Sequence, residues 1–553
     1  MGSQHQKVRV NLSNANFPFH SDFEGRTIIV AQNDQNYNYI DQIGETVRDR
    51  GIPQAFYMHN VVPTSQGYQA VAYDLNIPAM AGSTGNFDTV FPLYYTVPTS
   101  RVLFAPALGY NYIFDATVGV WTSRLTTPTL VGQVDPTTMV TTAYNQGTTY
   151  ICYSLKGVYK YNTSTKAMDT VAITGIVGTS IKGICTAYGY TIAWDANNNI
   201  YWSAIPTPTD FTPSLITGAG SGTPAGMNGN VNFCVPVAGG FLVYCERNVV
   251  SATYTGNLDF PFAFKEVPGS GGVNSIEQVT WQSNQSAHYG WTTAGLQQLN
   301  LNSAINVFPE ASEFFSKLIF EDFDEVTLKL TTTYLSFPLY TKLSCVSNRY
   351  VIFSYGVTPV FTHALVWDLY LNRWGKVKIP HIKAFEWNSP NPYGSITYAM
   401  LKNLNYGLLR YTTYGELNTA ANSAELANKN IAFLDQYGRV KTLNLDLAGV
   451  TQLGGVADGV LLIGKFQFSR GKFITHQYTE IENVVQGNNF SYYLVPTIDG
   501  KTLIDAVAGV LVTQGPNTVK YGKTIKGYSM SSLLIGAFNV VSLLIDFTLG
   551  GNR

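Results

Sequence analysis

One pattern recurs along the sequence: an apolar run, a turn that contains Asp or Asn, and a second run that carries an aromatic residue. It is found at residues 113–121, 159–168, 194–202, 366–374 and 433–440, which read IFDATVGVW, YKYNTSTKAM, WDANNNIYW, VWDLYLNRW and FLDQYGRV. Because Asp and Asn tolerate turn geometry and bond their own backbone, each copy predicts two β-strands joined by a polar turn. The intervals are irregular but mostly a few tens of residues, which is typical of the blades of a β-propeller.

The composition favours the same kind of fold and suggests an assembly. Aromatic residues make up 13% and charged residues 12% of the 553 residues, so the charged share is about half the usual one. The 36 Tyr and 50 Gly are typical of short strands and tight turns. The net charge of −1 argues against a simple nucleic-acid binder, but not against a channel through which DNA slides. We expect much of the neutral polar surface to be buried between subunits.

The sequence divides into three regions, and the predicted fold class is all-β. Residues 1–90 are expected to form an N-terminal arm whose strands contribute to a platform or to the first blade. Residues 91–450 are expected to form a β-propeller of about six or seven blades. Residues 451–553 contain longer alternating strands, which predict a C-terminal antiparallel β-sandwich or platform domain. Two segments, 311–320 and 419–433, could be short connecting helices.

The cysteines and the apolar segments bear on the cellular compartment. The five cysteines lie in apolar contexts without a CxxC pair, so we expect buried free thiols and assembly in a reducing cytoplasm. The first 19 residues have no apolar core of the kind that a signal peptide needs. The apolar stretch at 532–551 is interrupted by Gly536, Asn539 and Asp546, which favours strands over a membrane span. We therefore expect a soluble chain that does not insert into a membrane.

No motif predicts catalysis, a metal site or a cofactor. The seven histidines lie far apart, at positions 5, 20, 59, 288, 363, 381 and 476, without a metal-ligand spacing. The acidic run from Glu321 to Glu325 is expected to be a solvated loop or an intersubunit salt-bridge patch rather than a glycosidase pair. The Asn-rich turn at 194–199 is expected to be a turn rather than an ion site. We expect that the protein is not an enzyme.

Basic residues gather weakly in the last region. They are Arg470, Lys472, Lys520, Lys523 and Lys526. On alternating strands these side chains could line one face of the platform and contact DNA weakly and in a salt-dependent way. The simpler interpretation is that they are scattered solvating residues.

Several strings resemble a family of structural proteins in short-tailed bacteriophages. They are the opening VNLSNANFPFHSDFEGRTIIV, YTGNLDFPFAFKEVPGSGGVNSIEQV at 254–279, WDLYLNRWGKVKIPH at 367–381 and the ending SLLIGAFNVVSLLIDFTLGGNR. The family is the tail nozzle or hub, also called the packaged-DNA stabilisation or head-completion protein.

The resemblance implies a virion protein of the podophage tail that takes part in DNA ejection. It implies a propeller with a β-platform and a homohexameric ring below the portal adaptor, the head-to-tail connector protein. The ring would extend the channel for packaged double-stranded DNA, hold a tail needle or plug, and anchor tail fibres or tailspikes. The family is not catalytic, so no active-site residues carry over.

Two other functions fit an all-β chain of this kind. One is a carbohydrate-binding or receptor-binding tail propeller, with glycosidase activity as a variant. It would need an exposed aromatic platform, whereas Trp121, Trp202 and Trp374 recur at comparable places in the pattern and are expected to pack in the core. The other is a cellular propeller scaffold, which would carry WD or Kelch repeats that this sequence lacks.

Overall fold

The protein is described from a computed structural model of the chain. The described residues are 5–14, 28–29, 55–77, 79, 87, 89–93, 102–107, 110–115, 121–124, 139–162, 167–282, 285–307, 319–324, 329–334, 340–388, 429–444, 459–467, 474–483, 490–497, 510–512, 517–519, 525–527 and 529–549. Within them, helix is limited to the short 3-10 turns η1 (Leu12–Asn14), η3 (Gly178–Ser180) and η4 (Ile276–Gln278).

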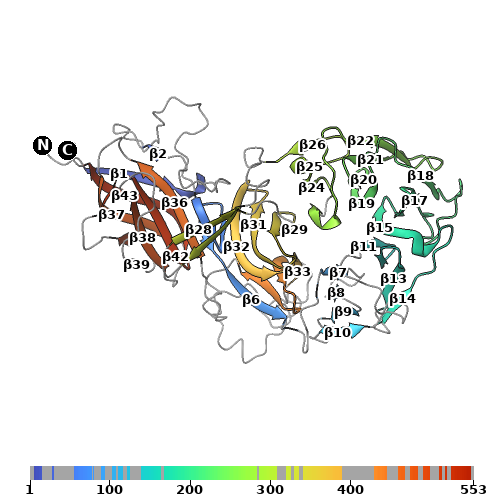
Figure 1. The fold of residues 1–553 in the computed structure, drawn as a ribbon, viewed down its shortest axis with the longest axis horizontal. Helices are drawn as coiled ribbons and strands as arrows, with labels where there is room; N and C mark the ends of the chain where they lie inside the picture. Colours follow the sequence, from blue (N-terminus) through green and yellow to red (C-terminus); the bar gives the residue numbers. More distant parts are fainter. Residues whose placement is uncertain are drawn as a thin grey trace, which may run out of the picture.

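Most described strands belong to four-stranded antiparallel sheets that follow one another around a ring (Figure 1). The first two are β7–β10 (Phe91–Leu93, Val102–Ala107, Tyr110–Asp115, Trp121–Arg124) and β11–β14 (Val140–Asn145, Thr148–Tyr153, Gly157–Asn162, Ala167–Thr170). The next are β15–β18 (Ile181–Ala187, Tyr190–Asp195, Ile200–Trp202, Gly220–Gly222), β19–β22 (Val231–Val237, Gly240–Cys245, Val249–Tyr254, Phe262–Glu266) and β23–β26 (Val279–Trp281, His288–Thr292, Gly295–Leu299, Ala304–Asn306).

The ring continues with two further sets of four strands. One is β29 (Tyr340–Val346), β30 (Tyr350–Gly356), β31 (Phe361–Asp368) and β32 (Arg373–His381). The other is β33 (Lys383–Asn388), β34 (Lys429–Leu434), β35 (Val440–Asn444) and, from the N-terminal region, β6 (Ala72–Ile77). The chain is thus a β-propeller, as its sequence pattern predicts, and the number of blades stays a prediction.

The propeller sheets are buried most deeply in their middle strands. All six residues of β16 and of β20 are buried, whereas the outer strands β18, β22 and β26 are largely half-buried or exposed. This gradient is expected where sheets pack face to face and only the outer strand of each meets water.

The N-terminal strands join distant parts of the fold. β6 completes the sheet of β33–β35, with Ile77 opposite Val440 and Ala72 opposite Asn444, and not the sheet of β7–β10. A strand that precedes the propeller in sequence therefore forms the outer edge of its last sheet. Strand β1 (His5–Asn11) pairs along its whole length with the C-terminal strand β43 (Asn539–Leu549).

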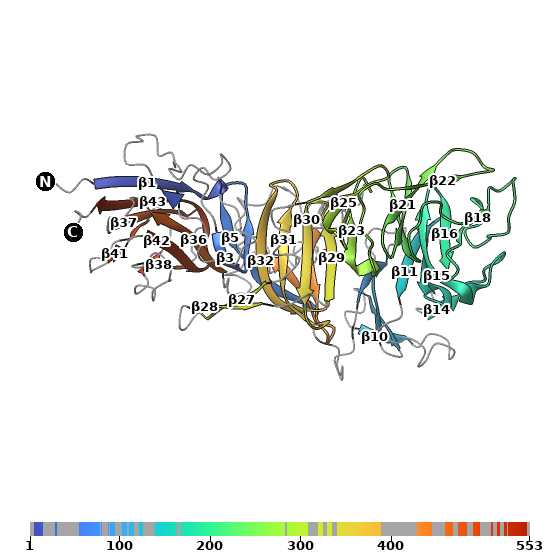
Figure 2. The same cartoon turned by 45° about the horizontal axis from the view of Figure 1, so that its top comes forward.

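Beyond the propeller lies a sandwich of two sheets (Figure 2), in which all described strand pairs are antiparallel except the parallel pair of β2 and β36. One of its sheets contains β2 (Ile28–Ile29), β3 (Ala55–His59), β36 (Gly459–Gln467), β38 (Phe490–Thr497), β39 (Val510–Val512) and β42 (Ser529–Gly536). The other contains β1, β43, β37 (Ile474–Asn483), β40 (Asn517–Val519) and β41 (Ile525–Gly527). The C-terminal platform that the sequence predicts is therefore present, and strands from the first 90 residues are part of it.

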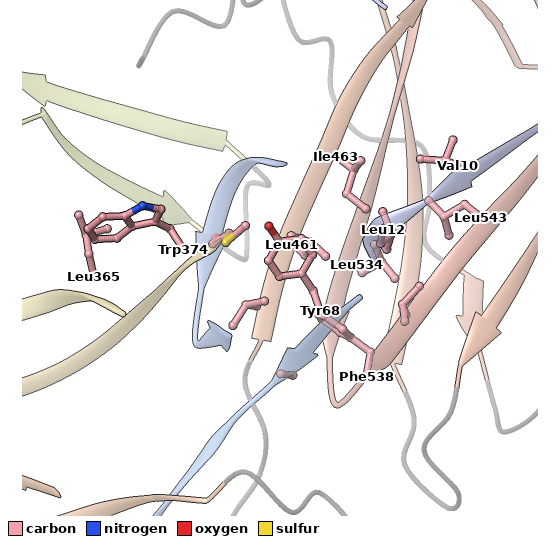
Figure 3. Close-up of a cluster of buried hydrophobic side chains, with 14 of the residues drawn as sticks. Val10, Leu12, Tyr68, Leu365, Trp374, Leu461, Ile463, Leu534, Phe538 and Leu543 are labelled. Atoms are coloured by element: carbon pink, nitrogen blue, oxygen red, sulfur yellow. The ribbon is translucent and has the colours of Figure 1, made fainter. Parts of the chain in front are cut away.

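The second sandwich sheet continues into the propeller. Strands β4 (Val61–Pro63) and β5 (Tyr68–Ala70) connect β32 to β43, so that one 11-stranded sheet runs from β29 to β40. One hydrophobic cluster follows this sheet, with Leu365 and Trp374 on the propeller side and Leu461 and Leu543 in the sandwich, all of them fully buried. Tyr68 lies between the two groups (Figure 3). Propeller and sandwich therefore share a core.

The prediction of short helices at 311–320 and 419–433 is wrong for the residues that the structure describes. Residues 319–320 belong to β27 (Ile319–Asp324), which pairs with β28 (Lys329–Tyr334), and residues 429–433 belong to β34. The segments 311–318 and 419–428 lie outside the described residues. The acidic residues Glu321, Asp322 and Asp324 thus lie in a β-strand and not in a loop. The periodicity of a short apolar run does not distinguish a strand from a helix. These residues are strands because they pair with a neighbouring strand.

Candidate functional site

The recurrent Asp residues of the sequence pattern close turns between adjacent strands. Oδ1 of Asp195 accepts hydrogen bonds from the backbone N–H groups of Asn197 and Asn199, at 2.8 and 2.9 Å. Its Oδ2 accepts from Tyr201 OH at 3.0 Å and from Nδ2 of Asn199 at 3.1 Å. Both carboxylate oxygens are therefore engaged within the turn, which makes this site a folding element and not a cation cage.

The same arrangement occurs at two later turns. Asp368 accepts from the N–H groups of Tyr370 and Leu371, at 2.9 and 3.1 Å. Asp435 accepts from the N–H groups of Tyr437 and Arg439, both at 2.9 Å. These hydrogen bonds explain why an Asp after an apolar run marks a turn between two strands.

The tryptophans of the pattern are core residues where their side chains are described. Trp374 is fully buried and stacks on Trp367, with ring centroids 5.5 Å apart and planes 9° apart. Trp202 is also buried and packs edge-on against Phe262. The side chain of Trp121 lies outside the described residues. Neither Trp202 nor Trp374 can form an open shelf for a sugar.

The histidines whose burial the structure describes, His59, His288, His363, His381 and His476, are all buried. His288 shares hydrogen bonds of 2.7 Å with Tyr244 OH and with the carbonyl of Pro236, and His381 bonds Ser354 Oγ at 2.8 Å. Burial lowers the pKa of His288, His381 and His476 to about 4 and that of His363 to about 2. Among the described residues, no group of three or more His, Cys, Asp or Glu side chains could hold a metal ion.

The five cysteines are free thiols, as predicted. Four are buried and Cys345 is half-buried. Burial raises the pKa of Cys152 and Cys245 to about 12, so their thiols stay protonated and unreactive near neutral pH.

Charged side chains meet at the inner edge of the propeller, where the first strands of neighbouring sheets lie against one another. Glu277 lies in η4, immediately before β23. Nζ of Lys383 is 2.8 Å from its Oε1, and Nζ of Lys342 is 3.4 Å from its Oε2. The hydroxyl of Thr89 donates to Oε1 at 3.0 Å. One carboxylate thereby joins residues at the start of four successive sheets, which places it close to the propeller axis.

The electrostatics of Glu277 suit a structural brace. Burial by itself would raise the pKa of Glu277, but the ammonium groups of Lys342 and Lys383 outweigh it and lower the pKa to about 2. A carboxylate with so low a pKa is a weak base, so the cluster is poorly suited to proton transfer at neutral pH. It holds adjacent sheets together by charge.

A second buried cation connects the propeller to the sandwich. Arg373, on β32, donates from Nη1 to the carbonyl of Thr64 at 2.9 Å. Its Nη2 donates to the carbonyls of Leu12 at 2.8 Å and Gly67 at 3.2 Å. The guanidinium also lies over the ring of Tyr68. The side chain of Arg373 therefore connects both η1, directly after β1, and the β4–β5 hairpin to the propeller.

The basic residues proposed as DNA contacts are only partly within the described structure. Lys526 is exposed on β41, opposite Thr475 on β37. Arg470, Lys472, Lys520 and Lys523 lie outside the described residues. The role of these five residues as DNA contacts therefore stays a prediction.

Sequence reasoning singled out neither Glu277 nor Arg373. A local signal existed for Glu277, because Ser275 and Gln278 have the spacing of a capping box and form one in the structure. Arg373 had no comparable signal, since its three carbonyl acceptors come from residues 306 to 361 positions earlier in the chain.

Comparison with known proteins adds nothing specific about function. No family model matches the sequence, and no curated protein matches it either. The chain is similar to the WD40 β-propeller domain of Doa1, with a TM-score of 0.37 and 10% identity over 68% of this chain and 98% of that one. It is also similar to a chain of the Mitotic Checkpoint Complex, with a TM-score of 0.32 and 11% identity over 56% of this chain and 87% of that one. These weak likenesses carry no functional inference.

No helix among the described residues is long and apolar enough to span a membrane.

Proposed function

We propose that this chain is the repeating subunit of a nozzle or hub ring in the tail of a short-tailed bacteriophage, a structural role without catalysis. Copies would form a hexameric ring below the portal adaptor, extend the channel for packaged DNA and anchor fibres or spikes. The strings quoted above, the low charge of the sequence and its strand-based scaffold support this proposal. Cyclic rings bury a different patch on each side of every subunit, which neutral polar surface suits.

The observation that carries the proposal is the union of propeller and sandwich. The 11-stranded sheet passes from one to the other, and Arg373 binds three backbone carbonyls across the junction. A subunit that retains pressurised DNA has to resist force without separating into domains. A shared core and a shared sheet provide that resistance, because both must break before the two parts come apart.

The axis of the propeller is a poor candidate for the DNA channel. The Glu277 cluster joins segments of successive sheets close to that axis, with contacts of 2.8 to 3.4 Å. Side chains that meet at these distances occupy the inner edge of the sheets, where a double helix would have to pass. In the proposed ring, the channel therefore lies between copies, and the exposed Lys526 on the sandwich is a candidate to face it.

The test is assembly with the partner that the proposal names. The full chain is mixed with a purified portal–adaptor complex and imaged by cryo-electron microscopy. The proposal expects a ring of this chain on the adaptor, coaxial with the portal. A chain that stays apart from the complex at micromolar concentration contradicts it. The control is the same chain added to the portal without adaptor, to which the ring should not attach.

A second candidate, a glycan-binding tail protein, is favoured by one aromatic pair in which Tyr188 is exposed and Tyr254 is half-buried. Tyr188 is 51% exposed and stacks on Tyr254 of the next sheet, with centroids 4.5 Å apart and planes 19° apart. Phe260, which is 73% exposed, lies in the loop that follows Tyr254. This candidate expects binding to host glycans that Tyr188→Ala abolishes. Glycan arrays without any signal from the full chain would eliminate it.

A further inference from the structure

The segment that leads into β19 contains the only Asn–Gly pair of the sequence, Asn228–Gly229. The structure requires a glycine at the second position. Gly229 has φ +86°, and an added Cβ would lie 2.6 Å from Oε2 of Glu246. Because glycine has no side chain, nothing shields its backbone nitrogen from the amide carbon of the asparagine before it.

The nitrogen of Gly229 is available for reaction. Asn228 and Gly229 are both exposed. Among the described residues, nothing accepts a hydrogen bond from the Gly229 N–H, and nothing bonds to the side-chain amide of Asn228. The backbone of Asn228 is anchored, because its N–H donates to Oδ1 of Asn248 at 2.9 Å and its carbonyl accepts from the Arg247 N–H at 3.2 Å. A nucleophile and its target thus lie next to each other in water, and neither is engaged elsewhere.

Two other exposed asparagines provide an internal comparison. Asn274 and Asn302 are each followed by a serine. The N–H of Ser275 donates to the glutamine of its capping box at 3.3 Å, and the N–H of Ser303 donates to Oδ1 of Asn300 at 2.9 Å. A nitrogen held in this way attacks a neighbouring carbon only after its hydrogen bond has opened. The structure therefore protects these two asparagines and leaves the Asn–Gly pair unprotected.

We propose that Asn228 is a site of spontaneous deamidation, which converts it into aspartate and isoaspartate. The Gly229 nitrogen loses its proton to solvent base and attacks Cγ of Asn228. The new N–Cγ bond forms, the Cγ–Nδ2 bond breaks, and the amide leaves as ammonia with a proton taken from water. Water then opens the resulting succinimide ring. Cleavage of the bond between nitrogen and Cγ leaves aspartate, and cleavage of the bond between nitrogen and the backbone carbonyl carbon leaves isoaspartate.

The net reaction replaces ammonia by water and needs neither an oxidant nor an enzyme. Isoaspartate should loosen the contact between this segment and the β20–β21 turn. The main chain then runs through Cβ and Cγ, so it gains a CH₂ group, and the carbonyl that accepts from Arg247 becomes part of a free carboxylate. This charge lies one residue from Gly229, against which the Glu246 carboxylate is placed, and like charges repel. The site does not depend on the function proposed above.

Peptide mapping of the full chain during incubation tests this site. The chain is kept at about pH 8, where solvent base removes the proton from the nitrogen more readily. Mass spectrometry measures the conversion of amide to carboxyl, and enzymatic methylation identifies isoaspartate. Each rate is divided by the rate at the same asparagine in the chain unfolded in guanidinium chloride, which removes the intrinsic difference between glycine and serine. Asn228 should react within about tenfold of its unfolded rate, whereas Asn274 and Asn302 should be slowed by more than about tenfold.

The matched variant is Asn228→Gln, which keeps an exposed amide but forms the corresponding ring far more slowly. Conversion in this segment should disappear in the variant. In the incubated unmodified chain, peptides covering 226–231 and 245–249 should lose protection from hydrogen exchange, and in the incubated variant they should keep it. A folded chain that does not convert at Asn228 while the unfolded chain does, or equal ratios of folded to unfolded rate at the three asparagines, overturns the proposal.

Discussion

The guanidinium carbon of Arg373 lies 4.4 Å from the centre of the Tyr68 ring, so a propeller strand and an N-terminal hairpin meet at one buried cation–π contact. The same guanidinium supplies hydrogen bonds to three backbone carbonyls. Charge, ring and carbonyls are withdrawn from water together. The guanidinium, the Tyr68 ring and the carbonyls each offset the cost of removing the others from water. Removal of any one of them should therefore destabilise the junction.

Replacement of Arg373 by Met should therefore destabilise the protein strongly. The substitution leaves three carbonyls without their donor and removes the cation from Tyr68, and we expect a loss of about 3–5 kcal/mol in the free energy of unfolding. Urea denaturation followed by Trp fluorescence measures it. Arg439→Met is the matched control, because Arg439 is 42% exposed in its ion pair with Asp435 and should cost less than about 1 kcal/mol. Equal losses for the two variants would contradict the role of Arg373.

Replacement of Glu277 by Gln should weaken the inner edge of the propeller. Gln keeps the size of the side chain but removes the negative charge that faces the half-buried Lys342 and Lys383, and we expect a loss of about 3–5 kcal/mol. Glu246→Gln, at an exposed position, is the control and should be nearly neutral. A Glu277→Gln protein as stable as the unmodified one would show that the cluster does not brace the sheets.

The buried histidines should make the fold sensitive to mild acid. Burial lowers the pKa of His288 and His381 to about 4, whereas the unfolded value is about 6.5. Between these values the unfolded chain binds more protons, so stability falls as the pH drops, by about 1.4 kcal/mol per pH unit for each such histidine. Unfolding free energies at pH 7, 6 and 5 measure the slope, and His288→Gln should reduce it by that amount. A stability that is constant from pH 7 to 5 would be inconsistent with neutral buried histidines.

Glu277 acts in the same direction as the histidines, but at lower pH. Its pKa in the folded state is about 2, below the unfolded value, so its contribution is present above about pH 4.5 and is lost as the pH falls toward 2. Below pH 4, therefore, the unmodified protein should lose stability more steeply than Glu277→Gln. Parallel curves for the two proteins in this range would rule this out.

The turn aspartates should tolerate Asn better than Ala. Asp195→Ala leaves two backbone N–H groups and Tyr201 OH without their acceptor and should cost about 1–3 kcal/mol. Asp195→Asn retains an oxygen for the backbone bonds and should cost less. Thermal unfolding of both variants, with the exposed Asp259→Ala as reference, measures the difference. An Asn variant no better than Ala would mean that charge, rather than the acceptor, matters at this turn.

Local features of the fold could be predicted from the sequence. The Asp turns at 195, 368 and 435 bond within a few residues of themselves, so their signal is contained in a short window. The longer strands after residue 450 alternate in a way that predicts a half-buried sheet. The burial of Trp202 and Trp374 follows from their place in the repeated pattern.

The remaining features of the fold depend on contacts between residues that lie far apart in the sequence. Pairing of β6 with β35 joins residues more than 300 positions apart, and pairing of β1 with β43 joins the two ends of the described chain. Residues 429–433 have helix-forming Ala and Lys neighbours, yet they pair with β33 and β35 as a strand. Tertiary pairing overrides local propensity at such positions. The brace at Glu277 and the clamp at Arg373 are likewise products of the assembled fold.

Native mass spectrometry of the full chain at increasing concentration tests the central claim most directly. A nozzle subunit should assemble into a closed ring, and the account predicts a hexamer as the dominant species, with ring-shaped particles of the same preparation in electron micrographs. A chain that remains monomeric at every concentration, and also in the presence of the portal–adaptor complex, would contradict it.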